Sequence, residues 1–320
     1  MIEEIEEYRF ERLSESNIED LKILYKDAFN ENRSTEYTNS KFNTQELGGK
    51  FFAFIAYDRQ NFPSAFYALF PFQLVLEGKK HFGGQIADLM THSSHRRKGL
   101  YYKLANHTHN FAKENGMEFI IGVSYGMNNG TYEGLKKLNF TDPENFGGYH
   151  LKIKTLPVNR YSQKSSILNK IYRPYFNFIK KLFFKKVDYF KYTQKETQYG
   201  EIIKDEKYIN YKYGYSTCMI LEIGKVRFLC KIKPDGSLAI GDIDKNNELD
   251  IHKAIKKLKR IAFWLGIRII QFEVSKGHLI DKVLSSKYSS VDKYRVLYYN
   301  LNENFPGDKI KYTLADIDTF

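Results

Sequence analysis

The sequence predicts an α/β protein with two mixed sheets, each flanked by helices. Strand-like and helix-like segments alternate over residues 8–154 in the order β-α-β-β-β-α-β-α-β, and the order strand–strand–helix–strand–helix–strand recurs after residue 208. A chain of 320 residues, of which 42% are apolar, is long enough for two such domains. We therefore expect a first domain over 1–157, a connector over 158–198, and a second, diverged copy over 199–320.

In the first half, apolar alternation predicts strands and a 3.6-residue apolar period predicts helices. The expected strands cover residues 8–13, 51–57, 64–76, 79–92, 118–124 and 150–154. Helices are expected over 18–29, 99–115 and 131–138. The first follows the N-cap pair Ser16-Asn17, and the second stops at Gly116. Residues 30–50 are polar, so a loop or irregular helix is expected there.

In the second half, the turn Pro234-Asp235-Gly236 separates two apolar runs and predicts a hairpin. Its strands are expected over 226–232 and 237–242, followed by strands over 267–274, 295–301 and 311–317. Helices are expected over 249–265, where the apolar period is strong and ends at Gly266, and over 278–287. Cys218 and Cys230 lie in apolar, strand-like sequence, so we expect two buried thiols in a reducing compartment.

The segment 84–104 is where the sequence is most informative about chemistry. An apolar strand leads into a basic turn that contains Arg96, Arg97, Lys98 and Gly99, and the turn leads directly into a helix. The first amides of a helix lack intrahelical partners, and the helix dipole adds positive charge there. Glycine also lets the backbone approach a ligand closely. These features together predict a site for a phosphate or pyrophosphate.

The run Arg96-Arg97-Lys98-Gly99-Leu100-Tyr101 resembles motif A of the GNAT acetyltransferases. In that family a strand leads into Arg/Gln-x-x-Gly-x-Gly/Ala, whose amides hold the pyrophosphate of acetyl-CoA. The resemblance implies acetyl-CoA as cosubstrate, and amides of Leu89, Met90 and Thr91 that hold the pantetheine and polarise the thioester carbonyl. Tyr101 departs from the small residue usual at its position.

Residues 126–140 resemble motif B of the same family, in which an Asn opens a helix beside the CoA arm. Asn128 takes the Asn position, and Asn139 stands where the family has Gly, because Asn also tolerates the left-handed conformation at a helix end. Leu135 occupies the place of the Tyr that protonates the departing thiolate in many members. Tyr132 and Tyr125 are the candidates for that role, and packing is the alternative for each.

Two residues near the end of the 79–92 strand are candidates for the general base. Strand alternation places Asp88, Met90 and His92 on one face. His92 suits proton removal from the substrate ammonium because its pKa is normally near neutral, and Asp88 is an alternative base or an anchor for the amine. A polar pair satisfied within the fold is the alternative. Metal binding is not expected, because no Cys or Glu completes a ligand set with the histidines of 81–109.

The resemblance implies direct acetyl transfer to a primary amine, since no Cys or Ser nucleophile with a base partner is visible. Residues 205–213 and 311–320 are similar to segments of Eis-like and tandem GNAT proteins from bacterial surface-polysaccharide clusters, which favours an amino sugar, nucleotide- or lipid-linked, as acceptor. A non-catalytic GNAT scaffold and a Fem-type aminoacyl transferase remain alternatives. Asp242 and Asp244 would repel phosphates, so the second half is not expected to bind CoA.

Most of the net charge of +12 lies in the connector. Residues 160–195 hold ten basic residues and one acid, Asp188, so no diffuse nucleic-acid surface is expected. Large apolar residues at near-helical spacing predict a basic amphipathic helix, kinked or broken at Arg173-Pro174. We expect it either to contact an anionic membrane or to pack on a domain. With no long apolar segment and an acidic N-terminus, a cytoplasmic, possibly membrane-associated location is expected.

Overall fold

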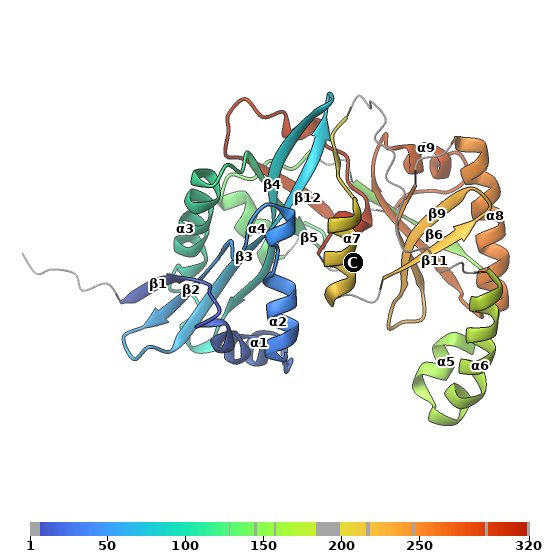
Figure 1. The fold of residues 1–320 in the computed structure, drawn as a ribbon, viewed down its shortest axis with the longest axis horizontal. Coiled ribbons are helices and arrows are strands. Elements are labelled where there is room, and N and C mark those ends of the chain that lie inside the picture. The colour runs from blue at the N-terminus through green and yellow to red at the C-terminus, as the bar shows by residue number, and fades with distance from the viewer. Residues whose placement is uncertain are drawn as a thin grey trace, which may run out of the picture. The chain divides into compact units, whose positions relative to one another are not determined.

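The computed structural model describes residues 7–127, 129–143, 146–156, 158–183, 199–215, 218–244, 247–291 and 294–318 (Figure 1). The chain forms two compact units. Unit 1 comprises residues 1–123, 128–143 and 297–308, and unit 2 comprises residues 124–127, 144–296 and 309–320. No helix among the described residues is long and apolar enough to cross a membrane.

Unit 1 contains a mixed sheet in the strand order β1-β2-β3-β4-β5-β12. Its strands are β1 (Tyr8–Arg12), β2 (Ala53–Asp58), β3 (Pro63–Leu76), β4 (Lys79–Thr91), β5 (Phe119–Ser124) and β12 (Arg295–Asn300). Neighbours from β1 to β4 are antiparallel, whereas β4 and β5 are parallel. Every residue of β3 except Gln73 is buried, because apolar side chains fill both of its faces.

Helices lie on both faces of this sheet (Figure 1). They are α1 (Leu21–Phe29), α2 (Thr35–Phe42), α3 (Leu100–Glu114) and α4 (Gly130–Lys137). α3 follows β4 directly and buries Leu100, Leu104 and Ala105 in the core of unit 1. The side chain of Ser34 caps α2 by accepting from the amide of Tyr37, so the polar 30–50 stretch contains a regular helix that the sequence pattern had left open.

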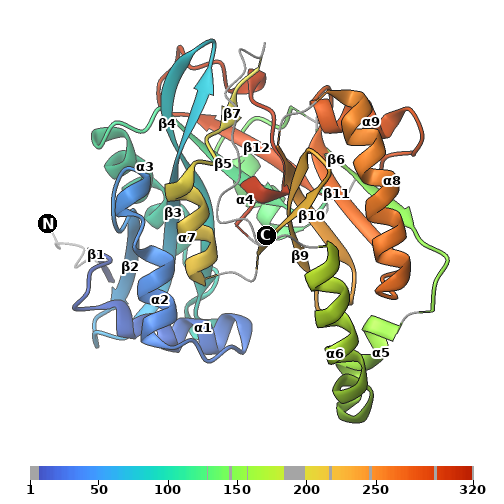
Figure 2. The ribbon, with the colours of Figure 1, turned by 45° about the vertical axis from the view of Figure 1, so that its right-hand side comes forward.

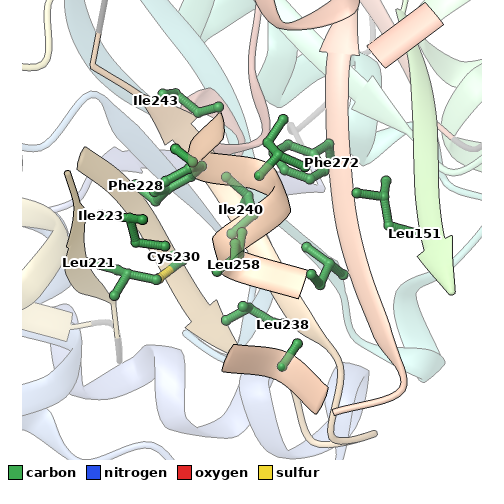
Figure 3. Close-up of a cluster of buried hydrophobic side chains, with 14 of the residues drawn as sticks. Leu151, Leu221, Ile223, Phe228, Cys230, Leu238, Ile240, Ile243, Leu258 and Phe272 are labelled. Atoms are coloured by element: carbon green, nitrogen blue, oxygen red, sulfur yellow. The ribbon is translucent and has the colours of Figure 1, made fainter. Parts of the chain in front are cut away.

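Unit 2 contains a five-stranded sheet in the order β6-β11-β10-β9-β8. Its strands are β6 (Phe146–Lys152), β8 (Met219–Ile223), β9 (Val226–Ile232), β10 (Leu238–Ile243) and β11 (Ile269–Ser275). Figure 3 shows Leu258 of α8 (Glu248–Trp264) packed with Phe228, Ile240 and Phe272 of the sheet. The remaining elements include β7 (Glu201–Ile202), α5 (Val158–Lys164), α6 (Ser166–Phe183), α7 (Glu206–Tyr215) and α9 (Leu279–Ser285).

Each unit contains one strand from the other half of the sequence. β6 follows α4 in the chain but pairs antiparallel with β11 of unit 2, from Phe146↔Ser275 to Lys152↔Ile269 (Figure 2). β12 follows α9 in the chain but lies beside β5 of unit 1. The expected boundaries at 157 and 199 therefore differ from the observed division, because a strand near each predicted boundary completes the sheet of the other unit.

The two sheets share two features, a short parallel strand pair and a bulge, as expected of a second GNAT-like half. In unit 1 the parallel strands β4 and β5 pair over Gly83–Gln85 and residues 119–121, and in unit 2 β10 and β11 pair over Leu238–Ile240 and residues 270–272. β4 has a bulge at Asp88-Leu89 opposite Tyr67, and β10 has a bulge at Gly241. The expected second GNAT-like half thus has the same strand geometry as the first.

Three expectations from the sequence require correction. Residues 311–317 do not form a strand, since Leu314–Asp316 is a 3-10 helix, η5, whose start is capped reciprocally by Thr313 and Asp316. β8 precedes the expected hairpin and adds an edge strand to it. At Pro174, which lies within α6, the expected alternative of a break is excluded, because the helix continues past it to residue 183. Neither Cys218 nor Cys230 forms a disulfide, and both are buried, as expected.

Candidate acetyl-CoA site

The predicted phosphate loop connects β4 to α3 in unit 1. After Thr91 the chain forms a short 3-10 helix, η3 (Ser93–His95), and α3 begins at Leu100. Arg97 and Gly99 both have a positive φ, of 65° and 74°. The amides of Tyr102 and Lys103 bond to the carbonyl of Gly99, so those of Leu100 and Tyr101 precede the first hydrogen-bonded turn. They point toward the loop and are available to an anion.

The basic side chains of this loop are exposed at its surface. Lys98 Nζ lies 2.9 Å from a carboxylate oxygen of Glu7, and Arg96 Nη2 lies 4.0 Å from Asp27. Exposed pairs of this kind are weak because water screens them, so an incoming phosphate can displace them. A Cβ on Gly99 would have no heavy atom within 4 Å, which shows that the space in front of the helix is open.

The edge of β4 beside this loop is the place for an extended ligand arm. Among the described residues, β4 pairs with β5 only as far as Gln85, and the strands then part. Asp88 has a φ of 49°, and the bulge it forms with Leu89 changes the direction of the backbone groups that follow. The amides near Leu89, Met90 and Thr91 therefore lie at an irregular strand edge next to the anion loop.

Asp88 is held within unit 1 by two neighbours. Lys41 Nζ lies 2.8 Å from its Oδ2, and the hydroxyl of Tyr25 donates to the same carboxylate. The side chains of Lys41 and Asp88 are 8% and 12% exposed, so this is an ion pair largely removed from water. These contacts favour the structural alternative for Asp88. Neither partner could be inferred from sequence, because Tyr25 fits the apolar stripe of α1 and Lys41 lies in a polar stretch.

His92 lies outside β4, at the start of η3. Its Nδ1 is 2.7 Å from the hydroxyl of Ser94, and its Nε2 is 3.5 Å from Asp27. Asp27 also accepts from the hydroxyl and amide of Ser93, and the hydroxyl contact lowers the pKa of this carboxyl. A carboxylate behind an imidazole orients the ring, an arrangement suited to a general base.

The expected common face for Asp88, Met90 and His92 is not present. The bulge shifts the alternation between residues 88 and 90, and the strand ends before residue 92. Met90 is buried, whereas Asp88 and His92 are partly exposed and have separate partners. The two candidate bases are therefore independent features of the site.

Tyr101 turns inward from the first turn of α3. Its ring contacts Gly134 of α4, where a Cβ would lie 3.1 Å from Tyr101 Cε1. The ring centroid is 5.9 Å from that of Tyr67 on β3, and burial raises the pKa of the Tyr101 phenol. A large residue is thus accommodated at the position where the resembling family has a small one.

α4 begins at Gly130, and the side chain of Asn129 caps it by accepting from the amide of Tyr132. Asn128, assigned to this role from sequence, lies outside the described residues. Asn139 has a φ of 62° and Phe140 N bonds to Leu135 O, the left-handed helix end that was expected of this Asn. Leu135 is buried against Gly122 of β5, so it fills the core.

The two candidate acids have different surroundings. The hydroxyl of Tyr132 donates to Asp142 at 3.0 Å within unit 1. Tyr125 is assigned to unit 2, is 65% exposed, and packs edge-on against Tyr294 with centroids 5.2 Å apart. Among the described residues there is no group of three or more His, Cys, Asp or Glu arranged to hold a metal ion.

The corresponding strand gap in unit 2 is filled by the chain itself. Thr313 bridges to Val274 of β11, and η5 contacts both β10 and β11 beyond their paired residues. Buried Lys204 lies 2.9 Å from Asp242 and 2.6 Å from Asp316. Burial alone would lower the pKa of Lys204, but the two carboxylates outweigh it and raise that pKa. Asp242 therefore has a fixed internal cation.

Residues 9–134 match the family model described as an acetyltransferase (GNAT) domain. This stretch is therefore similar to a GNAT acetyltransferase domain, which agrees with the predicted enzyme class, acyltransferase. This match covers the anion loop, the bulged strand and the start of α4. Comparison with curated proteins found no match to the chain.

Solved structures with a similar fold include several acyltransferases. A probable N-acyltransferase from Enterococcus faecalis has a TM-score of 0.59 at 10% identity, covering 92% of this chain and 73% of that one. A GCN5-related N-acetyltransferase from Kribbella flavida has a TM-score of 0.58 at 10% identity, covering 92% and 71%. The N-myristoyltransferase of Saccharomyces cerevisiae, solved with bound myristoyl-CoA, has a TM-score of 0.50 at 12% identity, covering 92% and 79%. These likenesses confirm the predicted mixed α/β, GNAT-like fold.

Proposed function

We propose that unit 1 binds acetyl-CoA and transfers its acetyl group to a primary amine. The observation that carries this proposal is the left-handed turn at Gly99, which presents the free amides of α3 beside the unpaired edge of β4. The turn suits a pyrophosphate, and the edge suits an extended pantetheine arm that bonds as a strand would. The match of residues 9–134 to the GNAT domain supports this choice of ligand.

The proposed reaction is direct transfer. The amine nitrogen attacks the thioester carbonyl carbon, whose oxygen takes up negative charge that amides near Leu89, Met90 and Thr91 stabilise. Collapse of this intermediate breaks the carbon–sulfur bond and releases the CoA thiolate. The ammonium proton passes to His92, whose imidazole is oriented by Asp27. Because Leu135 has no proton to give, Tyr132 or Tyr125 is the proposed donor to the thiolate.

The proposed acceptor class is an amino sugar, linked to a nucleotide or lipid, as in surface-polysaccharide synthesis. It rests on the resemblance of residues 205–213 and 311–320 to segments of Eis-like and tandem GNAT proteins. A single cosubstrate site is part of the proposal. The filling of the unit 2 gap by residues 312–316, and the acidic Asp242 and Asp244 there, support it. A peripheral membrane contact through 160–195 would use a different surface and is independent of this reaction.

The test is thiol release from acetyl-CoA in the presence of an amine panel: nucleotide-linked amino sugars, free amino sugars, aminoglycosides, amino acids and peptides. We expect release above the hydrolysis background, with an acetylated amine detected by mass spectrometry, for at least one amino sugar. Acetyl-CoA binding without turnover on any amine would favour a scaffold. If acetyl-CoA neither binds nor is turned over, the result would contradict the site itself.

A further inference from the structure

Helix α6 of unit 2 presents two different apolar faces. One face is buried: Tyr172 and Ile179 are each 8% exposed, and Phe176 packs on the core of the unit. The hydroxyls of Tyr172 and Tyr175 donate to the carbonyls of Leu265 and Trp264 at the end of α8. α6 is therefore attached to unit 2 through this face, as the packing alternative from the sequence expected.

The second apolar face of α6 points to solvent. Ile167 and Ile171 are each 71% exposed, and Phe178 is 60% exposed. At 100° per residue these three positions fall within about 40° of one another around the helix axis, so they form one stripe. Single exposed apolar residues are common on protein surfaces, whereas a contiguous row of large ones marks a surface that binds a partner or a membrane. Packing on the core therefore explains only half of the amphipathic pattern.

Basic residues lie beside this stripe. Lys170, Arg173 and Lys181 are exposed on one side of it, and residues 158–183 contain no Asp or Glu. Every charged side chain beside the stripe in this segment is therefore basic.

A second basic surface of unit 2 lines a cavity of about 790 Å³. Its lining includes Lys152, Lys154, Lys253, Lys256, Arg260 and Lys287, and it includes no acidic residue. Phe263 and Trp264, which are 47% and 60% exposed, complete the lining at the C-terminal end of α8. Since Tyr175 of α6 donates to the Trp264 carbonyl, the cavity borders α6 at Trp264.

We propose that this surface docks unit 2 on a bilayer that contains anionic phospholipid. The apolar stripe would enter the acyl-chain boundary, and Trp264 would lie at the head-group level that suits an amphipathic ring. The cavity would hold phosphate head groups through Lys256, Arg260 and their basic neighbours. A nucleic acid would use the cations but leave the aliphatic stripe in water, and an apolar protein partner would leave the cations unpaired. An anionic bilayer satisfies both features.

The test is co-sedimentation of the full chain with vesicles of phosphatidylcholine alone or mixed with phosphatidylglycerol, at low and high salt. We expect binding to the mixed vesicles that weakens but persists at high salt, because salt screens charge and leaves apolar insertion intact. Ile171→Gln with Phe178→Gln should weaken binding roughly 100-fold, since the bilayer then loses the two apolar side chains that would enter its acyl region. Lys256→Gln with Arg260→Gln should weaken it about 25-fold, at about fivefold per cation.

The matched control is Lys79→Gln with Lys80→Gln, which removes the same charge from the exposed start of β4 in unit 1. It should change binding less than about twofold, since these two cations are not part of the proposed docking surface. All six substituted positions are exposed, so circular dichroism and urea unfolding should match the wild type. Three results would each overturn the proposal: no sedimentation under any condition, equal binding to neutral vesicles, or equal losses in the control and the Lys256/Arg260 variant. Acetyl-CoA turnover with a soluble amine should be unchanged in the α6 variant.

Discussion

Tyr101 on α3 and Gly134 on α4 lie in direct contact, so that a Cβ at residue 134 would be tightly packed against the ring. A Cβ placed there would be 3.1 Å from Tyr101 Cε1 and 3.3 Å from its Cζ. The two residues come from the two segments that carry the GNAT resemblance. A bulky residue in the first is thus matched by the smallest residue in the second, which keeps α3 and α4 at a close approach beside the anion loop.

This contact predicts that Gly134→Val is destabilising. The added methyl groups overlap the Tyr101 ring, and overpacking of this kind costs about 1–3 kcal/mol. The cost should fall in a Tyr101→Ala background, where the ring is absent, and urea unfolding of the four proteins measures this coupling. Gly130→Val is the control on the same helix, because a Cβ at residue 130 meets nothing within 4 Å. Equal costs at both glycines would mean that the ring contact contributes nothing.

Gly99 and Gly116 separate the strain of a left-handed residue from its effect on the ligand. They have φ angles of 74° and 85°, lie at opposite ends of α3, and have open space at the Cβ position. Valine at either site should cost about 1–3 kcal/mol of stability, because β-branched residues avoid this conformation. Only Gly99→Val should weaken acetyl-CoA binding, by about tenfold or more if one charge-assisted hydrogen bond is lost.

Isothermal titration of acetyl-CoA into both glycine variants provides the comparison. Similar affinities for Gly99→Val and wild type would show that the pyrophosphate lies elsewhere. If Gly116→Val weakens binding as much as Gly99→Val does, the effect comes from instability of α3 and the loop assignment loses its support.

Asp88 and His92 are expected to differ in what their removal changes. His92→Ala should lower kcat with the true acceptor by about 10²–10⁴-fold and leave acetyl-CoA affinity nearly unchanged, as for loss of a general base. Asp88→Ala should instead reduce stability, by about 3–5 kcal/mol, because it removes the carboxylate that pairs with the buried ammonium of Lys41.

Two additional variants distinguish these roles. Lys41→Met in the Asp88→Ala background should restore part of the lost stability, since no unpaired charge then remains. A folded Asp88→Ala, Lys41→Met protein that keeps its kcat would leave His92 as the base. If that protein instead loses kcat while His92→Ala keeps it, the roles of the two residues are reversed.

The local elements of unit 1 could be predicted from sequence because their signals are local. The spacing of apolar residues predicts β4 and α3. The basic turn before residue 100 and the glycine at residue 116 then place the ends of α3 to within a residue or two. The bulge at Asp88 has no such signal, since Asp is one of several residues that tolerate a positive φ, and it decides how Asp88 and His92 are directed.

The sequence also could not predict that β6 joins the sheet of unit 2 and β12 the sheet of unit 1, and here the reason is different. The pattern of residues 146–152 specifies a strand but not its partner, and β11 lies more than a hundred residues later in the chain. The partners of Asp88 were missed likewise, because the contacts from Tyr25 and Lys41 span 63 and 47 residues. Sequence pattern specifies which segments are strands, whereas non-local packing specifies which strands and side chains meet.

His109 predicts how the stability of unit 1 depends on pH. Its Nε2 lies 2.8 Å from the hydroxyl of Tyr67, and burial lowers the pKa of His109 to about 4, from an ordinary value of 6.5. As pH falls below 6.5, His109 becomes protonated in the unfolded chain but stays neutral in the folded protein. The free energy of unfolding therefore decreases until about pH 4. The full contribution is present above pH 6.5, and about 2 kcal/mol of it should be lost by pH 5.

His109→Gln keeps a polar partner for Tyr67 but does not titrate. Urea unfolding at pH 7 and pH 5 should therefore show a smaller decrease for His109→Gln than for wild type, by about that amount. Since all other titrating groups are shared, an equal decrease in the two proteins would mean that His109 is protonated in the folded state near its ordinary pKa.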